Sequence, residues 1–393
     1  MQNSMKFFFT SILLLPSLFC PGQALRDINY SYLYDPAERI RFDMIPVRST
    51  SSWTIIYTLQ VRDTTIDEVD DYKIEWQGRE ALSNKDGETL SPTLGEHQKR
   101  SDRLTGSIAL TMADAPKILV ARIVNLSSNR AYFFYTFLEE NFPVNNYLVS
   151  SGEPLVKTYV PTGQSATLAG SSEHWIVSYY NDNFPAAAPA FSEGQAKVTK
   201  GMEADSVYIV TSATPVRIFA DGLYLFQKDT LAPEGFALRG ENDYPRYTLI
   251  RNLPGPLIYI CTKQEYDRLE NAKGDKKAFD RTVLSMTGDT DRARKLIRNY
   301  FRRVELANQY FTSFKEGWKT DRGMIYIVFG LPDEVYKFSD REVWTYDNEA
   351  FDITFDFTRA STIFDPDNYV LIRERRYQTT WYEVIDLWRN ARF

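Results

Sequence analysis

Apolar and polar positions alternate through the first third of the chain, and this alternation predicts β-strands. In Trp53–Val61 every odd position carries a large apolar side chain, whereas Thr54, Thr58 and Gln60 face the other way. A period of two is typical of a strand with one buried face. Similar runs lie at Leu104–Met112, Ile118–Val124 and Ala131–Leu138. Residues 25–144 are therefore predicted to form a β-sandwich of immunoglobulin-like type.

A second β-rich segment covers residues 145–262 and predicts another sandwich. Asp221-Gly222, between two apolar runs, is a strong signal for a two-residue hairpin. Phe184–Phe191 interrupts the pattern because its prolines cannot donate hydrogen bonds to a sheet. This segment is either a loop that covers a sandwich edge or an exposed apolar docking segment. The strands are expected at Trp175–Tyr180, Ser206–Val210, Val216–Ala220, Leu223–Phe226, Tyr247–Ile250 and Leu257–Cys261.

Spacings of three and four replace the alternation after Thr262 and predict a two-helix connector over residues 263–316. Thr262 and Glu265 form a capping box that begins the first helix, which has a weak point at Gly274. Gly288-Asp289-Thr290 separates this helix from the second one. The apolar stripe of the second helix consists of Ile297, Tyr300, Phe301, Val304, Ala307, Phe311 and Phe314.

The second helix runs into Gly317-Trp318-Lys319-Thr320-Asp321, which we call the motif. Gly317 is expected to end the helix in the left-handed conformation, and Trp318 to cover the last helical turn. Thr320 and Asp321 are expected to accept hydrogen bonds from neighbouring backbone N–H groups. The motif is therefore predicted to be structural first and functional only by consequence.

An α+β module is predicted over residues 317–393. Its first strand is expected at Gly323–Phe329, and a second turn follows that contains Gly330, Pro332 and Asp333. Further strands are expected at Arg341–Asp347, Phe351–Thr358 and Tyr369–Arg375, with a closing helix at Tyr382–Ala391. The predicted fold class is thus multidomain and mainly β: two immunoglobulin-like β-sandwiches, a two-helix connector and a C-terminal α+β module.

The motif and its flanks carry a resemblance to a known family. Tyr300–Val304 and Ala307-Asn308 precede the motif, and Tyr326–Glu334 follows it. With these flanks the chain resembles the GWxTD-domain proteins secreted by Bacteroidota and related bacteria. The resemblance implies a cell-envelope protein with β-rich domains ahead of a GWxTD module, and it implies no activity. The module is also loosely similar to SmpA/OmlA-type outer-membrane assembly lipoproteins, through Gly330-Leu331-Pro332, Trp344-Thr345-Tyr346 and residues 353–357.

The first 24 residues predict a secretory signal peptide. One lysine precedes the apolar run Phe7–Phe19, and small residues at Gly22 and Ala24 favour cleavage after Ala24. The run is too short to span a bilayer. Lipidation of Cys20 is the alternative, and the bulky Phe19 before it makes a lipid anchor unlikely. The protein is therefore expected to be exported, to the periplasm or the periplasmic face of the outer membrane.

Composition narrows the possible partners. The chain is 43% hydrophobic and 15% aromatic, and its net charge is −6, or −7 once Lys6 is removed with the signal peptide. Without a long basic run, nucleic acid is not an expected partner. The acidic loop Asp63–Asp71 lacks the spacing of an EF-hand, so neither a metal nor a cofactor is predicted. Cleavage would leave Cys261 as the only cysteine, which excludes an intramolecular disulfide.

Two groups of side chains are candidates for a binding surface. Arg298, Arg302 and Arg303 lie on the basic half of the second helix, where they either bind an acidic partner or are simply solvated. Trp344 and Tyr346 form either part of the module's core or part of a carbohydrate-stacking platform. That platform would also use Trp318, Trp381 and Trp388.

The sequence contains no assembled catalytic motif. Its two histidines, His97 and His174, form no His-Glu-x-x-His pattern, and no Gly-x-Ser-x-Gly elbow is present. A glycosidase needs only two carboxylates, for which Asp321 and Asp333 are the pair to test. No catalytic residue is assigned. The preferred hypothesis is a non-enzymatic envelope protein that binds another protein, and the alternative is a protein that binds or processes glycans.

Overall fold

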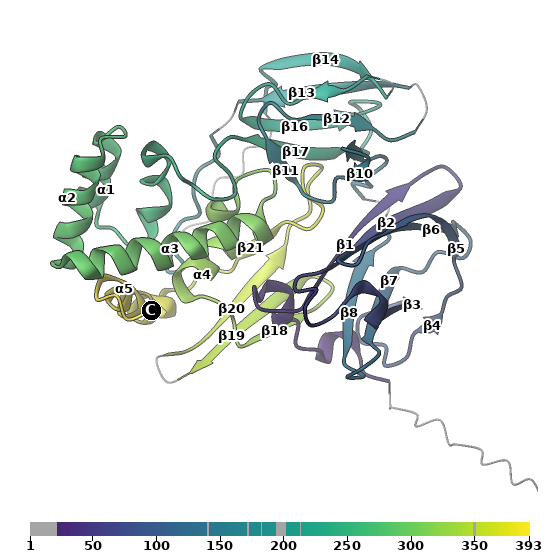
Figure 1. Cartoon of the computed structure of the whole chain (residues 1–393), viewed down its shortest axis with the longest axis horizontal. Helices are drawn as coiled ribbons and strands as arrows, with labels where there is room; N and C mark the ends of the chain where they lie inside the picture. Colours follow the sequence, from purple (N-terminus) through teal and green to yellow (C-terminus); the bar gives the residue numbers. More distant parts are fainter. Residues whose placement is uncertain are drawn as a thin grey trace, which may run out of the picture.

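The computed structural model describes residues 22–139, 141–170, 173–181, 183–193, 202–212, 214–348 and 351–393. Most of the predicted signal peptide, including Cys20, lies outside these residues, so its cleavage or lipidation stays a prediction. The described residues form five β-sheets, with the helices gathered in the C-terminal part of the chain (Figure 1). The predicted multidomain, mainly β fold class is confirmed.

The first sandwich has two four-stranded sheets, ordered β1-β2-β6-β5 and β4-β3-β7-β8. All their pairs are antiparallel. Alternate residues such as Ile55, Leu59, Leu119 and Ile123 are fully buried between the sheets, as a period of two requires. The bounds are β1 Ile40–Arg48, β2 Ser52–Val61, β3 Tyr72–Arg79, β4 Glu88–Thr89, β5 Thr93–Lys99, β6 Arg103–Thr111, β7 Ile118–Asn125 and β8 Ala131–Phe137.

The second sandwich combines the sheet β10-β9-β12-β15 with the five-stranded sheet β11-β17-β16-β13-β14. Only the pair of β11 and β17 is parallel. Trp175, Val177, Tyr224 and Phe226 are fully buried in its core. The bounds are β9 Leu148–Ser150, β10 Glu153–Pro154, β11 Tyr159–Pro161, β12 Ser165–Leu168, β13 His174–Tyr180, β14 Ser206–Thr211, β15 Val216–Arg217, β16 Gly222–Gln227 and β17 Phe236–Glu241.

Two predictions in this region are wrong. The strands expected at Tyr247–Ile250 and Leu257–Cys261 are replaced by two short 3-10 helices, Ile250–Asn252 and Gly255–Tyr259. Pro254 and Pro256 explain the second change, because proline fixes φ near helical values and cannot donate to a sheet.

The hairpin predicted at Asp221-Gly222 is also absent. β15 pairs with β12, whereas β16 pairs with β13 and β17, so the two strands around this dipeptide are not partners. Gly222 has φ of +142°, and a Cβ there would lie 2.6 Å from the carbonyl oxygen of Tyr180. The glycine therefore allows a close approach of two strands and does not form a tight turn.

The C-terminal part contains five α-helices and the sheet β18-β19-β20-β21 among the described residues. The capping box is confirmed: Glu265 N–H donates to Thr262 Oγ1 (3.3 Å) and Thr262 N–H to Glu265 Oε2 (2.8 Å). The weak point at Gly274 is a full break between two helices. The bounds are α1 Lys263–Asn271, α2 Lys276–Thr287, α3 Thr290–Phe311, α4 Asp321–Phe329, α5 Gln378–Arg389, β18 Glu334–Lys337, β19 Arg341–Asn348, β20 Phe351–Arg359 and β21 Tyr369–Leu371.

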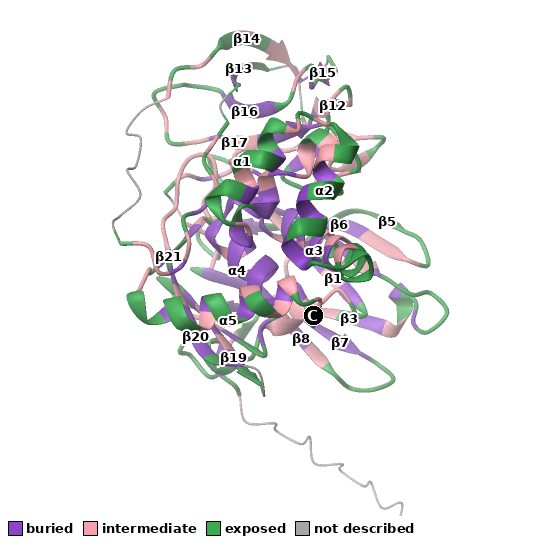
Figure 2. Cartoon of the chain, turned by 90° about the vertical axis from the view of Figure 1, so that its left-hand side faces the viewer, coloured by how far each residue is buried: buried purple, intermediate pink, exposed green. Residues whose placement is uncertain are grey.

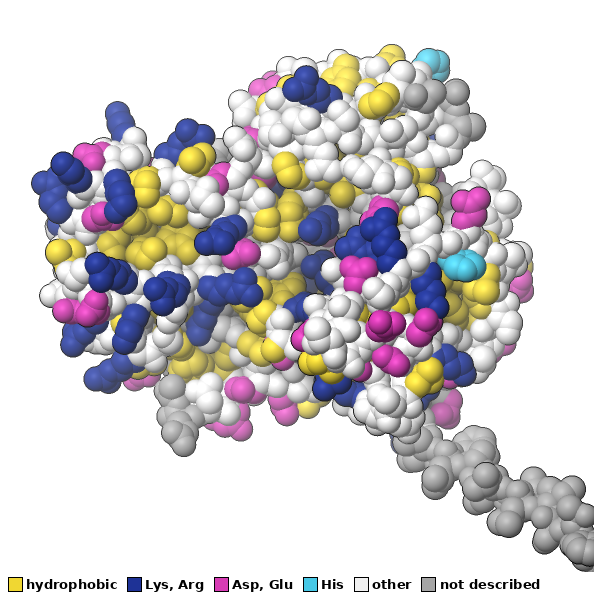
Figure 3. Space-filling model, viewed as in Figure 1, with side chains coloured by type: hydrophobic (Ala, Val, Ile, Leu, Met, Phe, Trp, Pro, Cys, Tyr) yellow, Lys and Arg dark blue, Asp and Glu magenta, His cyan; other side chains and the backbone are white. Residues whose placement is uncertain are grey.

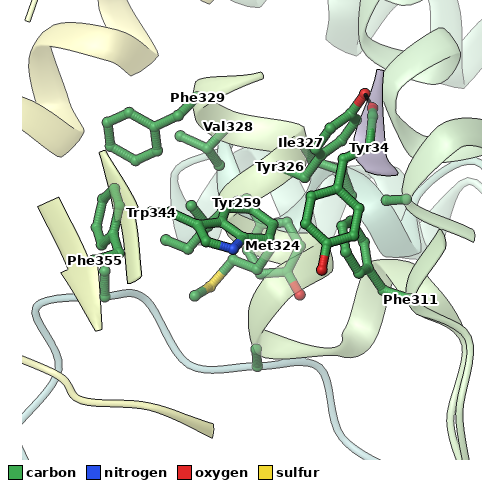
Figure 4. Close-up of a cluster of buried hydrophobic side chains, with 14 of the residues drawn as sticks. Tyr34, Tyr259, Phe311, Met324, Tyr326, Ile327, Val328, Phe329, Trp344 and Phe355 are labelled. Carbon is green, nitrogen blue, oxygen red and sulfur yellow. Dashed lines mark hydrogen bonds between the residues drawn. The ribbon is translucent and has the colours of Figure 1, made fainter. Parts of the chain in front are cut away.

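The strand predicted at Gly323–Phe329 is wrong, because these residues belong to helix α4. Every residue from Gly323 to Phe329 is buried, among aromatic side chains that include Phe311, Trp344 and Phe355 (Figure 4). A helix that is buried on all sides is apolar all round. Such a run has no periodicity to distinguish it from a buried strand.

One large hydrophobic core, the C-terminal core, joins distant parts of the chain (Figure 2). It contains residues of α2, α3, α4, α5 and β18–β21, together with Leu25 and Tyr34 from the N-terminal end. Ile118 and Val120 of β7 also belong to it, whereas Leu119 and Ile123 of the same strand face the first sandwich's own core. The helices of the predicted connector therefore pack inside this core and do not act as a linker.

Candidate functional site

The motif lies between α3 and α4, where Gly317–Lys319 form a single 3-10 turn. All five of its residues are buried, and Trp318 is only 7% exposed. The motif is therefore an internal junction and not a surface, and its geometry shows which parts of the chain it connects.

Gly317 does not take the predicted left-handed conformation. Its role is close packing, because a Cβ at this position would lie 2.2 Å from the carbonyl oxygen of Ala307 and 2.6 Å from Cα of Asn308. A second glycine, Gly323, is packed as tightly: a Cβ there would lie 1.8 Å from the Gly317 carbonyl oxygen. The two glycines let α3, the motif and α4 touch through their backbones. The sequence analysis did not single out Gly323.

Trp318 joins α3 to the chain that leaves the second sandwich. Its backbone N–H donates to Asn308 Oδ1 (3.0 Å), and its indole Nε1–H donates to the Tyr247 hydroxyl (2.9 Å). Its carbonyl oxygen accepts from the Tyr259 hydroxyl (2.8 Å). Asn308, which is fully buried, also donates to the Pro245 carbonyl (2.9 Å). The sequence signal for this network was Asn308, a polar residue on the apolar face of the second helix.

Thr320 and Asp321 serve different elements. Thr320 Oγ1 accepts from Gly323 N–H (3.0 Å) and so caps α4, as expected of a local acceptor. Asp321 instead accepts from the Leu371 N–H (2.7 Å) and from Arg373 (2.6 Å). Its carboxylate therefore satisfies the edge of β21 and a buried guanidinium, and the prediction that it bonds neighbouring backbone groups is wrong.

The segment Phe184–Phe191 packs against the motif, which neither interpretation of the sequence expected. The N–H of Ala187 donates to the Lys319 carbonyl (3.0 Å), and Arg373 donates to the Ala188 carbonyl (3.2 Å). Ala190 is fully buried in the C-terminal core. This proline-rich chain suits the position because it is already extended and few of its N–H groups need a partner.

Buried charges connect the motif to β17. Arg239, 3% exposed, donates to Glu241 Oε1 through Nε (2.9 Å) and to the Phe314 carbonyl (2.8 Å), and lies 3.7 Å from Glu316. Lys319 pairs with Glu316 (2.7 Å). Burial and the charge of Glu316 raise the pKa of Glu241 from 4.5 to about 7, against the opposing charge of Arg239. The second sandwich and the motif thus share one charge network.

The second predicted turn lies at the other end of α4. Gly330 has φ of +97°, and its carbonyl accepts from the Tyr346 hydroxyl (2.9 Å). Pro332 is buried, whereas Asp333 is exposed and accepts from the Asp347 N–H (2.8 Å). Asp321 and Asp333 therefore flank a helix about 13 Å long, at 1.5 Å per residue, and not a strand. They do not form the close carboxylate pair that a glycosidase requires.

The structure separates the residues predicted to form a binding surface. Arg298 and Arg302 are exposed on α3. Arg303 is turned inward, where it donates to the Val328 carbonyl (3.1 Å) and lies over the Trp388 ring. Trp344 and Tyr346 are buried in the C-terminal core, at 0% and 1% exposed. Trp318, Trp381 and Trp388 are buried too, so the interpretation of these aromatics as core residues is confirmed and the alternative of a carbohydrate-stacking platform is wrong.

Hollows among the described residues lie where the regions meet. A cleft of about 540 Å³ separates the first sandwich from the β18–β19 hairpin and is lined by charges of both signs, including Arg26, Lys117, Glu139 and Arg341. A cavity of about 150 Å³ lies between the two sandwiches and residues 363–366, and its wall is mainly apolar. No group of three or more His, Cys, Asp or Glu in the described ranges could hold a metal ion.

Comparison with known protein families identifies the domain that contains this junction. A family model for the GWxTD domain matches residues 222–390. The chain contains a GWxTD domain. The match begins at β16, so the domain includes two strands of the second sandwich as well as the helices, the motif and the C-terminal sheet. This extent agrees with the contacts of Trp318 and Arg239, which join those parts.

No curated protein matches the chain. The resemblance of the GWxTD domain to SmpA/OmlA-type lipoproteins stays a prediction. None of the helices among the described residues is both long and apolar enough to cross a membrane.

Proposed function

We propose that the protein is a non-enzymatic component of the cell envelope that binds another protein of the periplasm or outer membrane. The observation that carries the proposal is that the motif makes its hydrogen bonds inside the protein. The polar groups of Trp318, Thr320 and Asp321 are occupied by Asn308, Tyr247, Gly323, Leu371 and Arg373. These groups are not free to act on a substrate. The motif therefore stabilises the fold, and we assign recognition of the partner protein to the surface of the molecule.

Export is part of this proposal and rests on the N-terminal sequence. One lysine, an apolar run and small residues before Leu25 form the pattern of a signal peptide. Secretion by Bacteroidota, which the resemblance implies, and a position at the periplasmic face of the outer membrane belong to the same proposal.

The surface that we propose for the partner is the basic ridge of α3, defined as Lys295, Arg298 and Arg302. These three exposed residues are spaced by three and four, so they follow one another along the solvent face of the helix. Arg302 lies 3.5 Å from the partly exposed Glu305. Figure 3 shows Lys and Arg side chains gathered over the helical part of the molecule.

The charge of this region supports an acidic partner. Residues 263–316 contain 13 Lys and Arg against 9 Asp and Glu, a net charge of +4, in a chain whose total is −6. A positive surface on an otherwise negative molecule favours and orients approach of an acidic protein surface. The alternative of a glycan-binding or glycan-processing protein lacks a comparable observation, because the aromatic side chains proposed for it are buried.

Capture from native envelope extract tests the proposal. The bait is the mature protein, compared with Arg298→Glu/Arg302→Glu and with the control Lys277→Glu/Arg281→Glu, which changes two exposed basic residues of α2. We expect a stoichiometric protein partner to be captured by the wild type and the control and lost from the ridge variant. Retention on polysaccharide or peptidoglycan columns without any protein partner would contradict the proposal.

A further inference from the structure

β14 is the outer strand of the five-stranded sheet, and among the described residues its only partner strand is β13. Figure 1 shows it at the periphery of the second sandwich, away from the helices. Its sequence, Ser-Val-Tyr-Ile-Val-Thr, has no charge and no proline. Val207 and Ile209 are 60% and 69% exposed. An edge strand with exposed β-branched residues can add a further strand.

The hydrogen-bonding pattern shows which backbone groups are open. Beyond the end of the strand, the Ser212 N–H donates to the Glu173 carbonyl (3.2 Å), which continues the ladder with β13. In an antiparallel pair, residues that bond to the partner strand alternate with residues that do not. Counting back from Ser212 by twos, the even positions face β13. Val207, Ile209 and Thr211 therefore face away from β13. The Thr211 carbonyl already accepts from the Thr214 N–H (3.0 Å), so the groups open at the edge are the N–H and C=O of Val207 and Ile209 and the N–H of Thr211.

The other edges of the described sheets are protected. β5 contains a bulge and the charged residues Glu96 and Lys99. β18 is covered by the N-terminal segment, since the Tyr30 N–H donates to the Val335 carbonyl (2.8 Å). The Asp321 carboxylate covers β21 through the Leu371 N–H.

The remaining edges follow the same rule. β8 is covered by the Tyr32 hydroxyl, which accepts from the Phe133 N–H (3.1 Å). β1 carries Pro46 and charged side chains. β4, β10 and β15 are two residues long, and β11 has three residues and ends in Pro161. Because charge, proline, bulges and covers are the devices that block strand addition, β14 is the exception among these edges.

We propose that β14 pairs antiparallel with β14 of a second copy of this chain. A two-fold axis at Ile209 places the two Ile209 residues opposite each other and Val207 opposite Thr211, so that open positions meet open positions. About four backbone hydrogen bonds form in this register, two between the Ile209 residues and two from the Thr211 N–H groups to the Val207 carbonyls. No like charges meet, although the chain carries a net charge of −6. The two sheets become one continuous sheet, with the exposed branched side chains aligned on one face.

A measurement of mass in solution tests the pairing. Sedimentation equilibrium of the mature protein between about 1 and 100 μM should show a monomer–dimer equilibrium. Ile209→Lys places two lysines opposite each other and should raise the dimer dissociation constant at least about a hundredfold. Leu94→Lys is the control, because Leu94 is 70% exposed on the protected strand β5 and its change should leave the constant unaltered.

Hydrogen exchange locates the interface independently. In the dimer the Ile209 and Thr211 amides should exchange more slowly than at concentrations where the monomer dominates, and Ile209→Lys should abolish the difference. Circular dichroism and an unchanged melting temperature show that the variant is folded. A wild-type protein that stays monomeric at about 100 μM, or a dimer insensitive to Ile209→Lys, would overturn the proposal. If the β14 amides were protected only after envelope extract is added, the edge would bind a different protein. This result would also overturn the proposal.

Discussion

The first sandwich and the C-terminal core bury similar kinds of side chain but draw them from different distances along the chain. The first sandwich closes its own core with residues between Ile40 and Phe134, on strands that mostly follow one another. The C-terminal core extends from Leu25 to Trp388 and takes in Ala187 and Ala190 from the second sandwich segment. Local alternation is sufficient to specify the first, whereas the second depends on contacts between segments hundreds of residues apart.

Both regions bury charged groups beside their partners; in the first sandwich Glu38 is 7% exposed and pairs with Arg130 (2.8 Å). In the C-terminal part, Asp321 is buried and pairs with Arg373 of a later segment, whereas Glu316 pairs with the nearby Lys319 and lies 3.7 Å from Arg239 of β17. Glu342 is fully buried, and its carboxylate accepts from the Tyr34 hydroxyl (2.6 Å) and Trp344 Nε1 (2.7 Å). A buried charge is stable only with its partner in place, so these contacts make the distant segments depend on one another. The predictions below test that dependence.

The largest effect is expected from two matched tryptophan substitutions. Trp318 in the motif and Trp76 in the first sandwich are both 7% exposed. Truncation of either to alanine should lower the free energy of unfolding by about 3–5 kcal/mol. Hydrogen exchange should separate them. Trp318→Ala should lose protection at α3, α4 and residues 247–259 together, because Trp318 bonds to Asn308, Tyr247 and Tyr259, whereas Trp76→Ala should lose it in the first sandwich alone.

A stable Trp318→Ala protein that keeps its protection pattern and loses activity in a complementation assay would show the motif to be an active surface. A loss confined to the 3-10 turn would show that Trp318 does not couple the second sandwich to the helices.

The second effect concerns the two aspartates at the ends of α4. Asp321→Asn removes a buried charge that pairs with Arg373, whose side chain is only 11% exposed, and should cost about 3 kcal/mol. If Asp321 only accepted from neighbouring backbone N–H groups, as expected from the sequence, asparagine would keep an acceptor oxygen and the change would be tolerated. Asp333→Asn, at an exposed position, should change stability by no more than about 0.5 kcal/mol. Urea denaturation of both variants gives the comparison, and equal effects would contradict the buried pairing.

The third effect is a pH dependence from the charge network. The folded protein holds the Glu241 proton up to a pKa of about 7, whereas the unfolded chain releases it near 4.5. The folded state therefore binds the proton more tightly, and its stability falls as pH rises between these values, by about 2 kcal/mol from pH 5 to pH 7. Glu241→Gln removes the titrating group, so the difference in stability between wild type and variant should change with pH by that amount. A constant difference across this range would show that Glu241 titrates normally.

Much of the chain could be predicted from its sequence. Period-two alternation located β2 and β6, the capping box at Thr262 located the start of α1, and the motif with its flanks identified the GWxTD domain. Each of these signals is local, because strand faces, helix caps and short motifs depend on residues within one element.

Tertiary structure alone decided the rest. Residues 323–329 are a helix because they are enclosed on all sides, and enclosure removes the periodicity that would have identified it. Asp321 pairs with Arg373, and the Trp318 indole with Tyr247, across 52 and 71 positions of the chain. A polar side chain shows in the sequence that it needs a partner, but only folding determines which partner it meets. For the same reason Trp344 and Tyr346, equally suited to a core or a binding platform, became core residues when the helices closed over them.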